Sequence, residues 1–366
     1  MKIRSIEAIP LSIPYTYGAS AQVHGRNGIH NLDTCLLRVE TDDGLAGWGD
    51  AFAYGSLKPV TIAVREMVAP LAIGHDAADI DGLHLKIQKA LHIFGRYGIT
   101  VHALSGLDIA LWDLAGKRAG KPIAQLIGAP VRSTVPAYAS LLRYADQALV
   151  ARYAARAVEQ QYAAVKLHEI DESVIAAARA VVPAAVPLMF DVNCPWTPAQ
   201  AEEICARLAA HDPHWIEEPV FPPEDFSSLK RVRAAARVPV AAGENWCFEM
   251  QFRHALDAGA VDIAQPSVTK VGGITAFLKV MALARERGIR VAPHSPYFGP
   301  GAIATLHLLA HLPAPAWFEM FFLTAQASLY PETLVMNRGV LAIPQGPGLG
   351  VEPDAAVIAR YRQDRS

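Results

Sequence analysis

PLMFDVN (187–193), HWIEEP (214–219) and VPVAAGE (238–244) are the segments that decide the fold of this chain. Each is apolar until its last residues, where Asp191, the pair Glu217 and Glu218, and Glu244 appear. A buried strand has no use for a charge at its end unless that charge is paired or functional. The strand ends of a parallel barrel converge on one face, so these carboxylates are predicted to lie close together.

The same pattern continues on both sides of these segments. Five more short apolar runs occur along the chain: VPAYAS (135–140), AAVKLHE (163–169), VDIAQPS (261–267), IRVAPHS (289–295) and AWFEMF (316–321). Polar residues close the strand candidates at intervals of 23 to 27 residues, from Lys166 to Glu319. Helical or connecting segments follow each run, as where Thr197 and Pro198 precede AQAEEICARLAA as N-cap and first helical residue. Eight such units favour a parallel α/β barrel over an open sheet.

The first third of the chain has a different pattern, typical of a small α+β domain. It contains three strand candidates, at 2–14, 33–41 and 44–50. Three helical patterns follow, at 58–73, 77–91 and 101–120. The turn Asp42-Asp43-Gly44 joins the second and third strands as a hairpin. The polar stretch from 17 to 28 is too long for a tight hairpin and is a lid candidate.

The regular spacing ends near residue 330. The segment LVMNRGVLAIPQGPGLGVEP predicts a hairpin followed by a Gly/Pro loop. We therefore expect an N-terminal α+β domain at 1–125, a barrel with the metal site at 126–330, and a C-terminal segment at 331–366 that packs back on the first domain.

Composition limits the class of function. The formal net charge of the 366 residues is −2, so no basic excess points to nucleic acid or an anionic membrane. Four widely spaced cysteines without a CxxC pair are consistent with a reducing compartment. The N-terminus does not read as a signal peptide, and no apolar run is long enough to span a bilayer. We expect a cytoplasmic protein that binds neither nucleic acid nor membranes.

Three carboxylates on consecutive strands can hold one cation. Ligation by oxygen alone suits a hard ion such as Mg²⁺ or Mn²⁺. The alternative, in which every carboxylate is salt-bridged to a lysine or arginine of the barrel, needs three coincidences. Neighbours on a strand point to opposite faces, so only one of Glu217 and Glu218 should point inward, and spacing alone leaves open which one.

These segments resemble the enolase superfamily, specifically its mandelate racemase/muconate lactonizing enzyme branch. The resemblance covers essentially the whole chain and is carried by DVN, WIEEP, AAGENW, QPSVTKVGG, APHS and ALSGLDIALWDLAGK (103–117). It implies an α+β capping domain, a modified TIM barrel of the (β/α)₇β type, and Mg²⁺ held by Asp191, Glu217 and Glu244. Asn193 resembles a family position that helps to hold substrate or a metal-bound water, with capping of the next loop as the alternative.

The resemblance also implies removal of a proton α to a carboxylate, with the metal stabilising the charge of the resulting enediolate. Lys166 and His168 lie on one face of the second strand. Many relatives have two lysines there, with the second as the base. An imidazole with an unperturbed pKa near 6.5 can act as a base at neutral pH. We expect His168 to be the acid–base catalyst; the alternative is that it binds the carboxylate and Lys166 is the base.

The opposite side of the predicted site departs from the family pattern. His294 matches the histidine of the racemase subgroup, whose usual Asp partner at the sixth strand end is Ser267 here. A carboxylate raises the basicity of an imidazole, whereas a serine hydroxyl can only orient it. His294 is therefore expected to donate a proton to a leaving hydroxide or a carbanion. Asp262 begins its strand and is expected at the other end of the barrel.

Two further residues are candidates for contact with substrate. Glu319 resembles the family's carboxyl group that hydrogen-bonds the substrate carboxylate, with an ion pair to Lys166 or Lys270 as the alternative. His24, in the lid candidate, could contact substrate, and the alternative is an ordinary surface histidine.

The expected activity is Mg²⁺-dependent dehydration of a hydroxy or sugar acid to a 2-keto-3-deoxy acid, because this reaction needs one good base and one acid. Racemisation or epimerisation needs competent bases on both faces, and Ser267 weakens one of them. Cycloisomerisation is a further alternative, and a catalytically impaired metal-binding relative is the last. The expected partners are a small-molecule carboxylate and further copies of the chain in a homo-oligomer.

Overall fold

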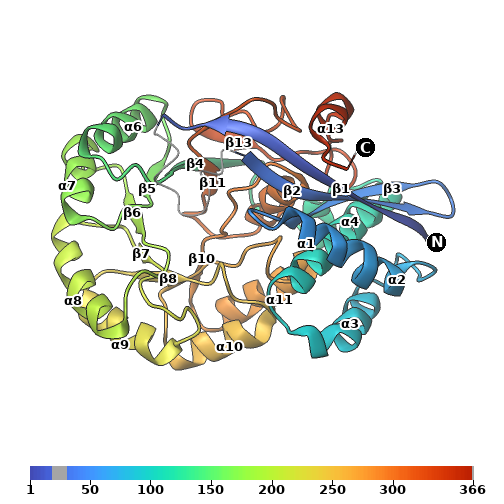
Figure 1. The fold of residues 1–366 in the computed structure, drawn as a ribbon, viewed down its shortest axis with the longest axis horizontal. Coiled ribbons are helices and arrows are strands. Elements are labelled where there is room, and N and C mark those ends of the chain that lie inside the picture. The colour runs from blue at the N-terminus through green and yellow to red at the C-terminus, as the bar shows by residue number, and fades with distance from the viewer. Residues whose placement is uncertain (19–30, 365–366) are drawn as a thin grey trace.

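The computed structural model describes residues 1–18 and 31–364 of the chain. His24 and most of the lid candidate lie outside the described residues. The part of the chain that the structure describes contains a parallel barrel with a smaller capping domain beside it (Figure 1). Among its helices, none is at once long and apolar enough to cross a membrane.

Eight parallel strands form the barrel, in the hydrogen-bonded order β10-β9-β8-β7-β6-β5-β4-β11. Their bounds are β4 (Thr134–Leu141), β5 (Ala164–Leu167), β6 (Leu188–Asp191), β7 (Ile216–Glu217), β8 (Val240–Ala242), β9 (Ile263–Ala264), β10 (Arg290–Val291) and β11 (Phe318–Phe321). All eight lie within the segments expected from the sequence, apart from one residue at each end of β4.

A helix follows each of the first seven barrel strands and none directly follows β11, so the (β/α)₇β prediction is confirmed. These helices are α6 (Gln147–Glu159), α7 (Glu172–Val181), α8 (Pro198–Leu208), α9 (Phe226–Ala236), α10 (Phe248–Ala258), α11 (Gly273–Glu286) and α12 (Pro300–Leu309). Figure 1 shows α6 to α10 along the outer rim. The Thr197 side chain caps α8 in a reciprocal capping box with Gln200, as the sequence predicted for the N-cap.

The two-residue period of the strands places the polar groups at one end of the barrel interior. The lower interior layer is apolar and consists of Tyr138, Ala164, Met189, Trp215, Ala241 and Ile263. The layer two residues further along the same strands holds Ser140, Lys166, Asp191, Glu217, Gly243 and Gln265. Asp262 lies at the opposite end, where it pairs with Arg233 at 2.7 Å and accepts a hydrogen bond from the Val240 amide.

The capping domain is an antiparallel sheet covered by helices. Its strands are β1 (Ile3–Thr16), β2 (Asn31–Thr41) and β3 (Ala46–Phe52), with β12 (Thr324–Ala325) added at the end of β1. Its helical segments are α1 (Leu57–Ile62), a π-helical turn (Ala63–Val68), α2 (Ala69–Ala72), α3 (Ile80–Leu91), α4 (Ile99–Ala119) and α5 (Ile123–Ile127). The predicted helix at 58–73 is therefore a continuous run whose middle is π-helical.

Helix α4 packs directly on β3, and two glycines make this close approach possible. A Cβ at Gly47 would lie 2.4 Å from the Ala110 carbonyl oxygen, and one at Gly49 would lie 1.9 Å from that of Gly106. No other residue fits at these two positions of the strand without moving the helix backbone.

The C-terminal segment contacts both domains. β13 (Val340–Ala342) pairs antiparallel with β4 of the barrel, and the expected hairpin is limited to the bridge between Asn337 and Val340. A last helix, α13 (Ala355–Tyr361), was not predicted. Arg362 then pairs with Glu7 of β1 at 2.7 Å. The domain boundaries at 125/126 and 330/331 stay predictions.

Candidate active site

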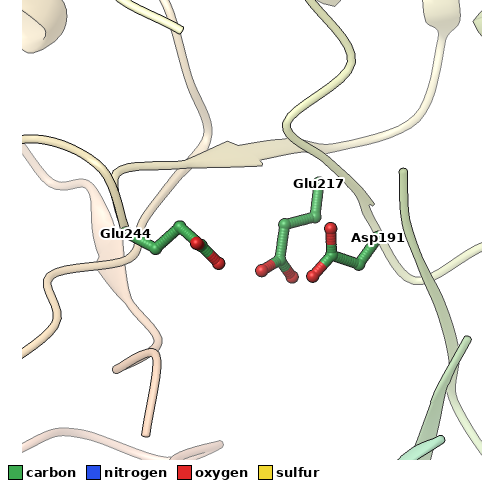
Figure 2. A group of neighbouring side chains, drawn as sticks. All are labelled: Asp191, Glu217 and Glu244. Atoms are coloured by element: carbon green, nitrogen blue, oxygen red, sulfur yellow. The ribbon is translucent and has the colours of Figure 1, made fainter. Parts of the chain in front are cut away.

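Three carboxyl groups from consecutive strands meet at the open end of the barrel. Asp191 ends β6, Glu217 ends β7, and Glu244 lies two residues beyond β8. One oxygen of each lies within 4.8 Å of an oxygen of the other two. Figure 2 shows Asp191 and Glu217 on one side facing Glu244 on the other. Carboxylate oxygens at this separation, two groups buried and that of Glu244 partly exposed, are a donor set suited to a hard divalent cation.

Glu218, the neighbour of Glu217, is not part of this group. Its φ of 47° takes it out of the extended strand conformation. Its carboxylate accepts hydrogen bonds from Asn245 Nδ2 at 3.0 Å and from the Cys194 thiol at 3.5 Å. Burial raises the pKa of Glu218 to about 8, and the charges of Glu244 and Asp191 add to this effect. The inward-pointing member of the pair is Glu217.

Lys166 is the nearest counter-charge to the carboxylates. Its ammonium group is fully buried and lies 3.1 Å from Asp191 Oδ2, 3.0 Å from Glu217 Oε1 and 2.7 Å from Glu319 Oε1. Burial disfavours the charged form, but the surrounding carboxylates outweigh it and raise the pKa of Lys166 well above its usual range. Lys166 therefore holds its proton at neutral pH in this arrangement.

The site carries an excess of negative charge. Asp191, Glu217, Glu244 and Glu319 supply four carboxylates, while Lys166 and Lys270 supply two ammonium groups; Lys270 Nζ lies 3.2 Å from Glu244 Oε1. Burial, followed by the charge of Asp191, raises the pKa of Glu217 well above its usual range. Uncompensated buried charge is costly. One divalent cation would balance the two charges that remain, so these residues fit a metal.

His168 lies beside the triad on the base side. Its Nδ1 is 2.6 Å from the Leu141 carbonyl oxygen, and its Nε2 is 3.1 Å from Asp191 Oδ2. A carbonyl oxygen only accepts, so Nδ1 carries a hydrogen in both protonation states of the ring, and Nε2 is the nitrogen that takes up or releases a proton. The Asp191 carboxylate beside Nε2 stabilises the protonated ring, so the contrast with His294 lies in the partner of Nδ1. The side chain is 13% exposed, against 0% for Lys166. Of the two basic groups on this strand, only His168 has a surface that substrate can reach.

His294, on the opposite side of the triad, has partners that favour the other tautomer of the neutral ring. Its Nε2 lies 3.0 Å from Glu244 Oε2, and its Nδ1 lies 3.0 Å from Ser267 Oγ and 3.1 Å from the Tyr297 hydroxyl. The carboxylate only accepts, whereas hydroxyl groups can donate. The neutral ring therefore carries its hydrogen on Nε2, which faces the site.

Glu319 and Asn193 support groups already described. Glu319 Oε1 accepts a hydrogen bond from Ser140 Oγ at 2.8 Å, and its Oε2 accepts one from the Ser295 amide at 3.1 Å. The ion pair of Glu319 with Lys166, the alternative role expected from the sequence, is present at 2.7 Å. Asn193 donates to Asp191 Oδ1 through its side chain at 2.9 Å and its backbone amide at 3.1 Å, which orients that carboxylate.

Three residues of the site were not selected from the sequence as site residues. Tyr297 contacts both Ser267 and His294. Lys270 contacts Glu244. Asn245, the third, accepts a hydrogen bond from Lys270 at 2.8 Å. All three follow a predicted strand end by one to three residues, and this proximity is the signal that could have indicated them.

Comparison with known proteins agrees with this geometry. Residues 149–357 match the family model described as enolase C-terminal domain-like. Residues 22–128 match the mandelate racemase/muconate lactonizing enzyme N-terminal domain. The chain belongs to the enolase superfamily, in its mandelate racemase/muconate lactonizing enzyme branch. It is accordingly an enzyme of the lyase or isomerase type.

Three relatives illustrate the range of the family. A D-galactarolactone cycloisomerase from Agrobacterium fabrum is 34% identical, over 89% of this chain and 90% of that protein. An arabinonate dehydratase from Saccharolobus solfataricus is 30% identical, over 91% of both chains. A mandelate racemase/muconate lactonizing protein from Paracoccus denitrificans, complexed with magnesium, superposes with a TM-score of 0.87 at 26% identity, over 100% of this chain and 99% of that one.

Proposed function

We propose that this protein dehydrates a sugar acid or related hydroxy acid to a 2-keto-3-deoxy acid, with Mg²⁺ as its cofactor. The observation that carries the proposal is the asymmetry of the two histidines. His168 presents Nε2 as a proton acceptor, and His294 presents Nε2–H as a proton donor. Elimination of water needs one of each.

In the proposed dehydration, each residue of the site has a separate role. His168 Nε2 takes the proton from the carbon next to the substrate carboxylate. His294 Nε2 gives a proton to the hydroxyl on the following carbon, which leaves as water, and the resulting enol tautomerises to the 2-keto acid. We expect the substrate carboxylate near Glu319, whose ion pair with Lys166 has no exposed surface in this arrangement and would have to open to admit it. Mg²⁺ held by Asp191, Glu217 and Glu244 would act as a Lewis acid toward that carboxylate and lower the pKa of the adjacent proton.

Cycloisomerisation is the second candidate. It uses the same proton abstraction, and the proton from His294 would go to a departing ring oxygen instead of a hydroxyl. The 34% identity to a D-galactarolactone cycloisomerase favours keeping this candidate. Racemisation would need His294 Nε2 as a base, and its hydrogen there, with hydroxyl partners at Nδ1, disfavours that role.

The remaining properties are narrower proposals. Mn²⁺ could replace Mg²⁺, because both are hard ions that suit oxygen ligands. We keep the cytoplasm as the expected location, and sedimentation would test the expected homo-oligomer.

The experiment is an incubation with Mg²⁺ in D₂O and a library of aldonic acids, aldaric acids and their lactones, including arabinonate and galactonate. The readouts are 2-keto acid formation and deuterium at the α-carbon of recovered substrate. Keto acid from one epimer only is the expected result. Exchange with both epimers would favour racemisation, rearranged lactone would favour cycloisomerisation, and no exchange with any member would refute the proposal.

A further inference from the structure

The capping domain makes two hydrogen bonds to the loop that follows His294 and contains Tyr297. Asp50, Phe52 and Tyr54 alternate at and beyond the end of β3. The Asp50 carboxylate accepts a hydrogen bond from the Gly301 amide. The Tyr54 hydroxyl donates to the Pro296 carbonyl oxygen at 2.5 Å. These two contacts lie on either side of Tyr297 in the chain.

Asp50 supplies the N-terminal cap that α12 lacks in its own sequence. Gly299, the N-cap residue, has no side chain to accept a hydrogen bond, and Pro300 has no amide hydrogen. The Gly301 amide is thus the first free donor of this ten-residue helix, and a buried carboxylate there also interacts favourably with the helix dipole. A Cβ at Gly299 would lie 2.5 Å from Asp50 Oδ2, and one at Gly301 would lie 2.8 Å from Oδ1. Both glycines therefore leave room for this carboxylate.

Phe52 continues the contact toward the centre of the site. Its ring packs edge-on against that of Tyr297, with centroids 6.4 Å apart. Lys270 Nζ lies 4.8 Å from the centroid of the same ring. The strand end of the capping domain is therefore in contact with the group that orients His294.

His168, in contrast, is held by the barrel itself. Its Nδ1 bonds to the Leu141 carbonyl, and its own carbonyl accepts from Arg143 Nε at 2.5 Å. Both partners lie at the end of β4 or just beyond it. Loss of the Asp50 or Tyr54 contact should therefore reach the proton donor and leave the proton acceptor in place.

We propose that Asp50 and Tyr54 are positioning residues that set the place of His294 through the loop 295–301, independently of His168. This inference rests on the proposed function, in which His168 takes the α-proton and His294 donates to the leaving group. The capping domain then governs how often an abstracted proton leads to product.

The test measures the partition between elimination and exchange in D₂O with Mg²⁺ and the acid sugar that the unaltered protein converts fastest in the library above. In Asp50→Ala we expect keto acid formation to fall about 10- to 100-fold, as for an Ångström-scale displacement of a catalytic group. Deuterium in recovered substrate per product formed should rise by a similar factor. Tyr54→Phe should shift the partition in the same direction by less. Asp50→Asn, which keeps an acceptor oxygen, should retain most of the keto acid formation of the unaltered protein.

Asp113→Asn is the matched control. Asp113 is a buried carboxylate of α4 that accepts from the Trp48 and Leu349 amides, away from the loop. Its variant should keep the partition of the unaltered protein even if its melting temperature falls. Equal losses of exchange and elimination in Asp50→Ala and Tyr54→Phe, or no change in either, would overturn the inference and leave the function standing. If Asp50→Ala does not fold, Tyr54→Phe decides. No turnover by the unaltered protein would refute the function itself.

Discussion

Replacing Glu217 with Gln should abolish stabilisation by Mg²⁺ without destabilising the metal-free protein by more than about 2 kcal/mol. Two unit charges at 4.8 Å, the upper limit of the separations in the triad, interact by about 3.5 kcal/mol at an effective dielectric constant of about 20, so Asp191 and Glu244 together repel an ionised Glu217 by at least roughly 7 kcal/mol. Lys166, at 3.0 Å, attracts it by roughly 5.5 kcal/mol. The repulsion is at least as large as the attraction, in line with the raised pKa of Glu217. A neutral amide of the same shape therefore costs little in the metal-free protein and is also cheaper to bury.

The assay is thermal unfolding after treatment with a chelator and again with Mg²⁺ added. At a Mg²⁺ concentration 100 times its dissociation constant, the native protein gains about 2.7 kcal/mol, or about 3.5 °C in Tm for a chain of this size. Glu217→Gln should melt near the metal-free native protein in both conditions.

Glu218→Gln is the control, since this neighbouring buried carboxyl group faces Asn245 and not the triad. Glu218→Gln should show the same rise in Tm with Mg²⁺ as the native protein. Equal shifts with Mg²⁺ in native protein and Glu217→Gln would refute the assignment of the ligands, as would no shift in the native protein.

Three other variants test the remaining assignments. His168→Asn, whose amide can still donate to the Leu141 carbonyl, should lower α-proton exchange about 10²- to 10⁴-fold; exchange that survives this change but not Lys166→Met would make Lys166 the base. Ser267→Asp should give the histidine beside it a carboxylate partner, so that exchange appears with both epimers in D₂O while keto acid formation slows; exchange still confined to one epimer would contradict this. Burial lowers the pKa of His307 to about 4, so its neutral ring contributes stability that is complete above pH 6.5 and is lost as the pH falls toward 4. His307→Gln should therefore remove about 2 kcal/mol of the stability lost between pH 7 and pH 5 in urea titrations, and an unchanged pH dependence would contradict the assignment.

The barrel and the carboxylate cluster could be predicted because they follow a period. Apolar strands with a polar residue at the end repeat every 23 to 27 residues, and the chemistry of the repeat requires those ends to meet. Strand alternation could not choose between Glu217 and Glu218, because that choice depends on where the backbone leaves the extended conformation. The resemblance to a family made the choice, and the structure has Glu217 facing the triad.

Local sequence patterns could not predict the contacts between the capping domain and the barrel. Asp50 and Gly301 are 251 positions apart, and neither lies in a repeat that relates one to the other. Tyr297 sits in a loop without regular alternation, so its direction depends on packing against Phe52 and not on a period. The same limitation explains why the C-terminal hairpin was overestimated. Apart from the bridge between Asn337 and Val340, this segment pairs with β4, where Val340 lies opposite Pro136.

One feature of the barrel links folding to chemistry. β10 and β11 stand at the two ends of the strand order, and around Ser295 the reciprocal bonds between its amide and hydroxyl and Glu319 join them. The carboxyl group that bonds to the Ser295 amide across this gap is also the one beside Lys166 in the site. Glu319 thus has a packing role in addition to the contact with substrate expected from the sequence. A substitution at Glu319 should therefore disturb the packing between the two end strands as well as the charge beside Lys166, so activity alone would not separate a chemical effect from a structural one.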